Sequence, residues 1–287
     1  MRPMLESWER GFAANHPGVR FENKLYGTVT AIAGLDHKEA ELAAMGRELG
    51  VDESMSFEWI YRYKPLVLKA STGSLDVRGE SPALAIVVNR KNPIGRLDLS
   101  RLRAGFTCCA SQEGSNVVRA KIVTWADLGA EGAFAARQVH PMGLGLVSDD
   151  AAFFRAAALN NSYQWSCNYR ALPDGNHVVS AVEADPDALA FTSVADATPQ
   201  VKILALVGAG GEAKLPTPES IEEHSYPLSR YTYLIANRGP GRALDPNVED
   251  FLRYVLSRQG QDDIARHGGY LPLPAPVAAQ QLKILNQ

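Results

Sequence analysis

The stretch Asp245-Pro-Asn-Val-Glu-Asp-Phe-Leu-Arg-Tyr-Val-Leu-Ser-Arg-Gln-Gly-Gln261 carries the clearest structural signal in the chain. Asp245 followed by proline is typical of a helix cap with proline at the first helical position, where a backbone N–H is not needed. Apolar residues then recur at positions i, i+3, i+4, i+7 and i+8, which predicts an amphipathic helix: Val248, Phe251, Leu252, Val255 and Leu256. A second short helix is expected to end at Gly268-Gly269.

Helix and strand signals are mixed along the rest of the chain, as in an α/β protein. Helical spacing predicts a helix over residues 3–14, and another over 52–61 with Asp52 as its cap. Apolar runs predict strands at 64–70, 83–89 and 231–236. Weaker patterns predict strands at 19–23, 177–182, 189–191 and 201–207, and helices at 31–35, 39–45, 97–106 and around Phe153-Phe154.

The composition is that of an ordinary globular protein and excludes several function classes. The 287 residues are 46% hydrophobic and 21% charged, and 29 basic residues against 32 acidic ones give a net charge of −3. This balance leaves no basic excess for nucleic-acid binding by counterion release, so we predict no nucleic-acid partner. The longest apolar runs, such as Leu84-Ala-Ile-Val-Val88, are too short to span a bilayer.

The sequence contains none of the common catalytic, cofactor or metal motifs. Its six histidines are scattered, with no pair at metal-binding spacing. Gly208-Ala-Gly-Gly211 follows a predicted strand, but the prolines of Lys214-Leu-Pro-Thr-Pro218 prevent the helix that a dinucleotide loop requires. We therefore predict no enzymatic activity, no cofactor and no metal. Cys108-Cys109 is compatible with a vicinal pair or a bond to Cys167, but buried inert thiols are the favoured interpretation.

Two segments have the composition of an anion-binding site. Gly27-Thr28-Val29-Thr30 and Val147-Ser148-Asp149-Asp150 each precede a predicted helix, and helix N-termini bind phosphate-like groups through unpaired N–H donors. Arg47 carries a guanidinium group of the kind that grips an oxyanion with two hydrogen bonds. The alternatives are plain helix capping for the two segments and a surface charge for Arg47, and for isolated residues these are the commoner cases.

The order of several segments resembles a known family. The most specific are Tyr226-Pro-Leu-Ser-Arg230 and Leu256-Ser-Arg-Gln-Gly-Gln261; the others are Ala40-Glu-Leu-Ala-Ala-Met-Gly-Arg-Glu-Leu49, Ala85-Ile-Val-Val-Asn89 and Thr124-Trp-Ala-Asp-Leu-Gly129. Together they resemble the phosphate-binding proteins of bacterial ABC importers, in the type II periplasmic binding protein superfamily. The resemblance covers nearly the whole chain.

This resemblance implies an α/β fold with two lobes, each a central mixed β-sheet flanked by helices. Lobe one would comprise residues 1–88 and 228–287, lobe two residues 89–227, and the hinge would lie near 84–92 and 226–235. The implied function is that of a monomeric, extracytoplasmic (periplasmic) solute-binding protein. It would capture phosphate or a related oxyanion between its lobes and deliver it to an ABC permease in the membrane.

Carried over position by position, the resemblance implies the ligand-binding residues Thr28, Thr30, Arg47, Ser148, Asp149 and Asp150. The family has serine where Gly46 stands and arginine where Leu144 stands, and it has Ser-Gly-Thr in place of Ser148-Asp149-Asp150. One aspartate can favour protonated phosphate over sulfate by accepting its hydrogen bond, but two carboxylates without a cation repel a dianion. The alternative function is therefore a structural or signalling descendant of the family that has lost phosphate binding.

The beginning of the chain also departs from the family pattern. The family has a strand and a first ligand-binding loop before its first helix, whereas here a helix is predicted almost immediately after Met1. The absence of this strand is either a peculiarity of the fold or a truncation at the N-terminus, and in the second case we expect the missing part to hold the strand, the loop and a signal peptide.

Overall fold

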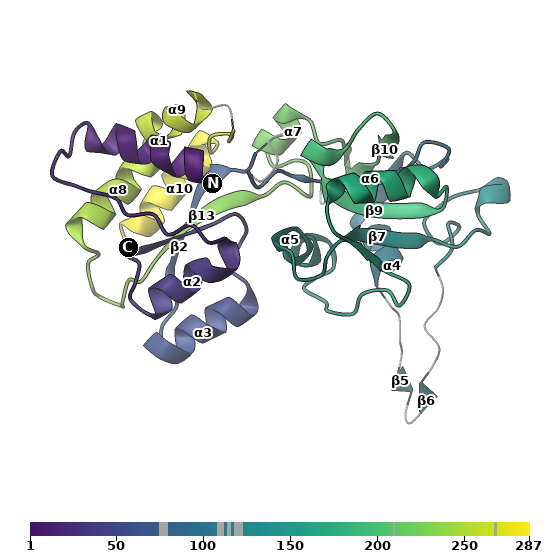
Figure 1. The fold of residues 1–287 in the computed structure, drawn as a ribbon, viewed down its shortest axis with the longest axis horizontal. Coiled ribbons are helices and arrows are strands. Elements are labelled where there is room, and N and C mark those ends of the chain that lie inside the picture. Colours follow the sequence, from purple (N-terminus) through teal and green to yellow (C-terminus); the bar gives the residue numbers. More distant parts are fainter. Residues whose placement is uncertain (75–79, 108–111, 114–115, 118–122, 209, 267–268) are drawn as a thin grey trace. The chain divides into compact units, whose positions relative to one another are not determined.

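Two separate segments of the chain, Met1–Pro82 and Arg230–Gln287, fold together as unit 1, and the segment between them, Ala83–Ser229, forms unit 2 (Figure 1). The computed structural model describes residues 1–74, 80–107, 112–113, 116–117, 123–208, 210–266 and 269–287. Each unit has its own β-sheet and its own hydrophobic core.

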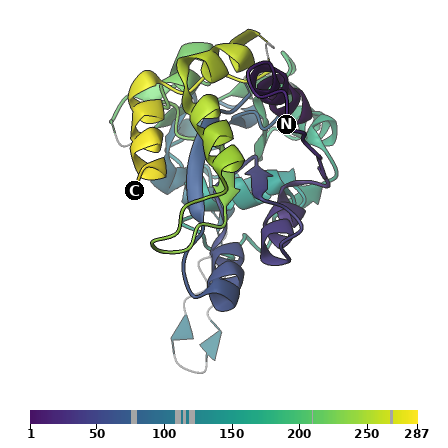
Figure 2. The same cartoon turned by 90° about the vertical axis from the view of Figure 1, so that its left-hand side faces the viewer.

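Unit 1 is built on a three-stranded sheet in which β13 (Tyr231–Ala236) lies between β1 (Leu42–Met45) and β2 (Leu66–Thr72). Both neighbours run antiparallel to β13. Successive side chains of a strand point to opposite faces of its sheet, so Leu234 and Ile235 face different layers. Leu234 joins the core of four helices, which are α1 (Arg2–Ala13), α8 (Pro246–Leu256), α9 (Arg258–Arg266) and α10 (Ala275–Leu285) (Figure 2). Ile235 joins the core of α2 (Thr28–Asp36) and α3 (Val51–Tyr61) on the other face.

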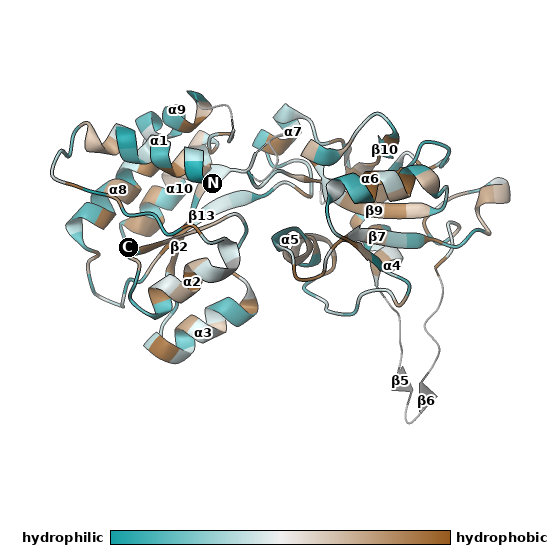
Figure 3. Ribbon diagram, in the orientation of Figure 1, coloured by the Kyte–Doolittle hydropathy of each residue, from teal (hydrophilic) through white to brown (hydrophobic). Residues whose placement is uncertain are grey.

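Unit 2 is built on a five-stranded mixed sheet with the strand order β10-β3-β9-β7-β8. Strand β7 runs parallel to β8 and β9, and β3 runs antiparallel to β9 and β10. Every residue of β3 and β9 is buried, and β9 is coloured as apolar in Figure 3. The strands are β3 (Leu84–Asn89), β7 (His140–Leu144), β8 (Arg170–Leu172), β9 (Ala188–Ser193) and β10 (Val201–Ile203), and the main helices are α4 (Leu99–Phe106), α5 (Asp149–Ala158) and α6 (Gly175–Ala184).

Smaller elements complete unit 2. Strands β4 (Arg96–Asp98), β11 (Ala205–Val207) and β12 (Ala213–Lys214) form a second sheet, and β5 (Gln112–Glu113) pairs with β6 (Asn116–Val117). The remaining helical pieces are α7 (Pro218–Glu222) and two short 3₁₀ turns, Gly132–Phe134 and Val194–Asp196. Among the described residues, no helix is both long enough and apolar enough to cross a membrane.

The predicted α/β architecture is confirmed, and so are its strongest elements. The helices predicted at 3–14 and after Asp245, and the strands predicted at 64–70, 83–89 and 231–236, are present as α1, α8, β2, β3 and β13. The sheet of unit 2 is mixed as expected, whereas the three-stranded sheet of unit 1 is antiparallel.

Three predicted segments are wrong in type. Residues 39–45 contain strand β1 instead of a helix, because Ala43 and Met45 alternate into the core below α2 and α3. Residues 177–182 lie in helix α6 instead of a strand, because the Asp174 side chain caps the helix and Val178 and Val182 both face the unit 2 core. Residues 19–23 belong to no helix or strand of the described chain, and Phe21 packs against Phe12 and Phe251.

Two further details differ from the sequence expectations. Gly50, not Asp52, is the N-cap of α3. Cys167 is exposed, not buried, and Cys108 and Cys109 lie outside the described residues.

The segments that connect the two units are tied to each other by hydrogen bonds. Within unit 1, the Arg230 Nε donates to the Pro82 carbonyl at 2.7 Å, and within unit 2 the Leu84 N–H donates to the Leu228 carbonyl at 3.2 Å. Strand β3 pairs with β9 and β10 in unit 2, whereas the family resemblance predicts residues up to 88 in lobe one. The hinge at these segments remains a prediction.

Candidate anion-binding site

In unit 1, the N-terminus of α2 meets the loop that follows β1. Gly27 is the N-cap of α2 and has a φ of 109°, a conformation that favours glycine. The Gly46 N–H points to the Thr28 Oγ1 at a distance of 3.4 Å. The Thr30 hydroxyl donates to the Gly27 carbonyl at 2.9 Å, so it caps the turn from which it comes. The structure therefore brings Thr28 to the Gly46 loop, while Thr30 serves its own backbone.

A third segment, at Ser81, reaches the same place. A Cβ atom added to Gly46 would lie 2.2 Å from the Ser81 Oγ and 3.7 Å from the Thr28 Oγ1. The Ser81 hydroxyl therefore occupies the space that a side chain at position 46 would need, and the family resemblance has a serine at position 46. Ser81 was missed because it is 35 residues from Gly46 in sequence (81 − 46) and stands in no recognisable motif. Only Gly46 could have indicated this contact from sequence, because a glycine in place of the family's serine leaves room for the side chain of another residue.

Arg47 is buried and bonded to a carboxylate of the same unit. Its Nη1 and Nη2 donate to the two carboxylate oxygens of Glu53, each at 2.8 Å, and Nη1 also donates to the Glu48 carbonyl at 3.0 Å. The Glu53 carboxylate accepts the Gly50 N–H at 2.7 Å and so closes the N-terminus of α3. Burial by itself would raise the pKa of Glu53, but the hydrogen bonds from Arg47 and Gly50 outweigh it and hold that pKa below its usual value.

In unit 2, the predicted segment lies at the start of α5. Ser148 is the N-cap, and its Oγ accepts the Ala151 N–H at 3.1 Å, while Asp149 and Asp150 occupy the first turn. Two acidic side chains in a first turn stabilise a helix through its dipole. The capping alternative considered from sequence is therefore realised for Ser148, and an anion arriving here would share the helix N-terminus with two carboxylates.

The carboxyl end of β7, which leads into the loop before Ser148, is held by aromatic groups. A Cβ added to Gly143 would lie 2.5 Å from the Phe191 ring, and the Tyr169 hydroxyl donates to the Leu144 carbonyl at 2.7 Å. Burial raises the pKa of Tyr169, so this phenol stays protonated and keeps donating. The neighbouring Val147 is exposed. Packing therefore requires glycine at position 143, and the aromatic groups hold the last two residues of β7.

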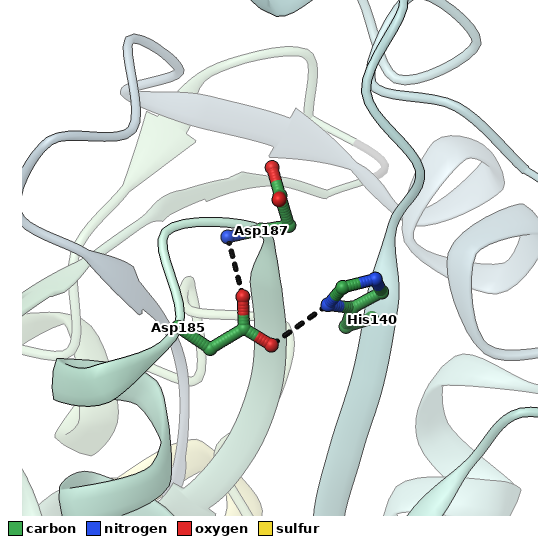
Figure 4. A group of neighbouring side chains, drawn as sticks. All are labelled: His140, Asp185 and Asp187. Carbon is green, nitrogen blue, oxygen red and sulfur yellow. Dashed lines mark hydrogen bonds and ion pairs between the residues drawn. The ribbon is translucent and has the colours of Figure 1, made fainter.

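One group of side chains in unit 2 has the residue types of a metal site (Figure 4). One ligand atom from each of His140, Asp185 and Asp187 lies within 4.8 Å of the others. However, His140 Nδ1 is 2.7 Å from Asp185 Oδ2, and the Arg137 guanidinium pairs with Asp187, with Nε 2.6 Å from Oδ1. The group lies at the amino end of β7, whereas Ser148 follows the carboxyl end of that strand. Arg137 already supplies the positive charge that a cation would bring.

Comparison with known proteins identifies the class to which this fold belongs. Residues 1–259 match the model of the PBP superfamily domain. The fold resembles an ABC-type phosphate transport receptor from Vibrio cholerae (TM-score 0.63, 17% identity, 95% of this chain and 96% of that one). It also resembles PstS from Borrelia burgdorferi (TM-score 0.63, 15% identity, 95% and 94%). The chain is a member of the PBP superfamily.

Sequence relatives narrow the class to one family. The chain is 30% identical over 287 residues to the phosphate-binding protein PstS of Pseudomonas aeruginosa, covering 99% of this chain and 83% of that protein. It is 24% identical over 197 residues to protein SphX of Synechococcus elongatus, covering 67% of this chain and 54% of that protein. The chain therefore belongs to the phosphate-binding protein family, as the sequence motifs predicted.

Proposed function

We propose that this protein is the solute-binding component of an ABC importer and that it captures inorganic phosphate or a closely related oxyanion. The observation that carries the proposal is its 30% identity, along nearly its whole length, to the phosphate-binding protein PstS. Two features of the chain support it. Each unit presents a helix N-terminus with a hydroxyl-bearing residue, Thr28 on α2 and Ser148 on α5. N–H groups in the first turn of a helix favour an anion.

The proposed ligand groups are hydroxyls and backbone N–H groups, with carboxylates beside them. Thr28 and Ser148 supply hydroxyl oxygens near helix N-termini, whereas the Thr30 hydroxyl donates to the Gly27 carbonyl and supports the turn before α2. A carboxylate of Asp149 or Asp150 would accept a hydrogen bond from the O–H group that phosphate carries at neutral pH. Sulfate has no such proton, so the same carboxylates repel it. This combination favours phosphate over sulfate.

The place of work and the partner follow from the same proposal. A solute-binding component acts outside the cytoplasm and passes its ligand to a membrane permease, and we propose both for this protein. We further propose that it acts as a monomer and catalyses no reaction. We propose that it captures and releases its ligand, and that the permease recognises the ligand-bound form, in which the two units have closed around the ligand.

Equilibrium dialysis with radiolabelled phosphate tests the proposal. We expect saturable binding to one site per chain that excess unlabelled phosphate abolishes and that sulfate at the same concentration leaves intact. Absence of binding at millimolar phosphate would contradict the proposal and favour a descendant that has lost the ligand. Equal displacement by sulfate would contradict the assigned role of Asp149 and Asp150.

A further inference from the structure

Glu53 holds the guanidinium group of Arg47 through two parallel hydrogen bonds. Both hydrogen bonds of the pair measure 2.8 Å, and the two side chains are only 10% and 16% exposed. Two parallel N–H to carboxylate bonds form the strongest arrangement for this pair. If Arg47 turned to an anion, the largely buried carboxylate of Glu53 would lose its cation, which is unfavourable.

The same pair fixes the backbone between Gly46 and α3. Glu53 accepts the Gly50 N–H at 2.7 Å, and Arg47 donates to the Glu48 carbonyl at 3.0 Å. Both ends of the short segment from 47 to 50 are therefore tied to one ion pair. Gly46 directly precedes this segment, and its N–H is the group that faces Thr28 at the start of α2.

We propose that Glu53 is a positioning residue of the anion site in unit 1 and that it acts through Arg47 and the backbone of Gly46. This inference rests on the proposed function. Arg47 then holds the Gly46 N–H beside Thr28 and does not itself contact the anion. The anion is met in unit 1 by uncharged donors, the Thr28 hydroxyl and backbone N–H groups.

Two substitutions separate this role from a direct contact of Arg47 with the anion. In Glu53→Gln the carboxylate charge is removed, so an arginine that binds the anion would be released and would bind it more tightly. In Arg47→Lys the charge is kept, but a lysine cannot form the two-bond pair with Glu53. A direct ionic contact survives the second substitution, whereas the positioning role fails in both.

Isothermal titration of the full chain with inorganic phosphate, at several salt concentrations, is the test. We expect each variant to bind about tenfold more weakly, the equivalent of one misplaced hydrogen bond to a charged group. The double variant should be no weaker than either single variant, and the dependence of Kd on salt should match that of the wild type. Arg253→Lys is the matched control, because Arg253 pairs with Glu249 on the surface of α8. It should bind as the wild type does.

Several outcomes would overturn the inference: tighter binding by Glu53→Gln, wild-type affinity in Arg47→Lys, or a Kd unchanged in both folded variants. If the wild type itself binds no phosphate, the proposed function fails. Hydrogen exchange then still tests whether Glu53 holds the backbone of Gly46 in place. Faster exchange of the Gly46 amide in Glu53→Gln than in the wild type, with native circular dichroism, would support it. Unchanged exchange there would contradict it.

Discussion

The Nε of Arg230 donates a hydrogen bond of 2.7 Å to the carbonyl oxygen of Pro82; Pro82 is the last residue of unit 1 before the chain enters unit 2, and Arg230 is the first after it returns. The side chain of Arg230 is buried, and its own carbonyl accepts the Gly73 N–H at 2.8 Å. One residue of the Tyr226-Pro-Leu-Ser-Arg230 motif thus contacts both Gly73 and Pro82, which lie close to each other but far from Arg230 in sequence.

Arg230→Met should destabilise the protein by about 1–3 kcal/mol, because the Pro82 carbonyl loses its donor in a buried place. Urea unfolding followed by circular dichroism measures this loss. Arg258→Met is the control, since Arg258 lies almost fully exposed on α9, and it should unfold as the wild type does. Equal midpoints for Arg230→Met and the control would show that the bond contributes nothing.

The Arg47–Glu53 pair should make stability depend on pH in the acid range. The pKa of Glu53 is lowered in the folded protein, so its contribution is complete above the unfolded value of about 4.3 and is lost as the pH falls through the folded value. Glu53→Gln should cost about 3 kcal/mol at pH 7, because the buried Arg47 loses its anion. The difference between the two proteins should shrink steadily below about pH 4.3 in urea unfolding series. A difference that stays constant with pH would contradict the pairing.

Gly46 and Ser81 should compensate for each other. A Cβ at position 46 would lie 2.2 Å from the Ser81 hydroxyl oxygen, so Gly46→Ala should destabilise by about 1–3 kcal/mol through overpacking. In a Ser81→Gly background the same substitution should cost little. The measurement is a double-mutant cycle of unfolding free energies. Gly18→Ala serves as the control, because no atom lies near its added Cβ. An equal cost of Gly46→Ala in both backgrounds would rule out the contact.

The group His140, Asp185 and Asp187 should behave as an ion-pair network. Because Arg137 already pairs with Asp187, we expect neither a chelator nor added Zn²⁺ to change the melting temperature or the phosphate affinity. His177→Ala is the comparison variant, because His177 forms a similar histidine–aspartate pair with Asp174 outside this group, and it should respond to Zn²⁺ as the wild type does. A Zn²⁺-induced rise in melting temperature that disappears in Asp185→Asn would instead establish a metal site.

The elements predicted correctly are those whose signal is local and unambiguous. The stripe from Val248 to Leu256 begins at a capped proline, and all five of its apolar residues are buried. The failures occurred where packing overrides local preference. Alanine favours a helix, yet β1 is a strand because Ala43 and Met45 pack beneath α2 and α3. Valine favours a strand, yet Val178 and Val182 lie in α6, whose N-cap Asp174 was overlooked.

In the candidate site, too, the features with a local sequence signal could be predicted and those created by folding could not. The position of Thr28 at a helix N-terminus was predictable because a glycine and threonine at a helix start form a local signature, while its role as a ligand residue stays a prediction. The partner of Arg47 was missed because the N-cap of α3 is glycine, which lacks the hydroxyl of the usual Ser/Thr-x-x-Glu capping signal. Ser81 could not be found from local pattern, because its proximity to Gly46 arises only when β1 and the segment after β2 fold together.

Titration of the full chain and of Thr28→Val with inorganic phosphate, followed by isothermal calorimetry, tests the central claim most directly. Valine keeps the shape of threonine and removes the hydroxyl that faces the Gly46 loop. We predict saturable one-to-one binding by the wild type and about tenfold weaker binding by the variant, the equivalent of one hydrogen bond to a charged group. No heat of binding at millimolar phosphate, or identical isotherms for the two proteins, would contradict the account.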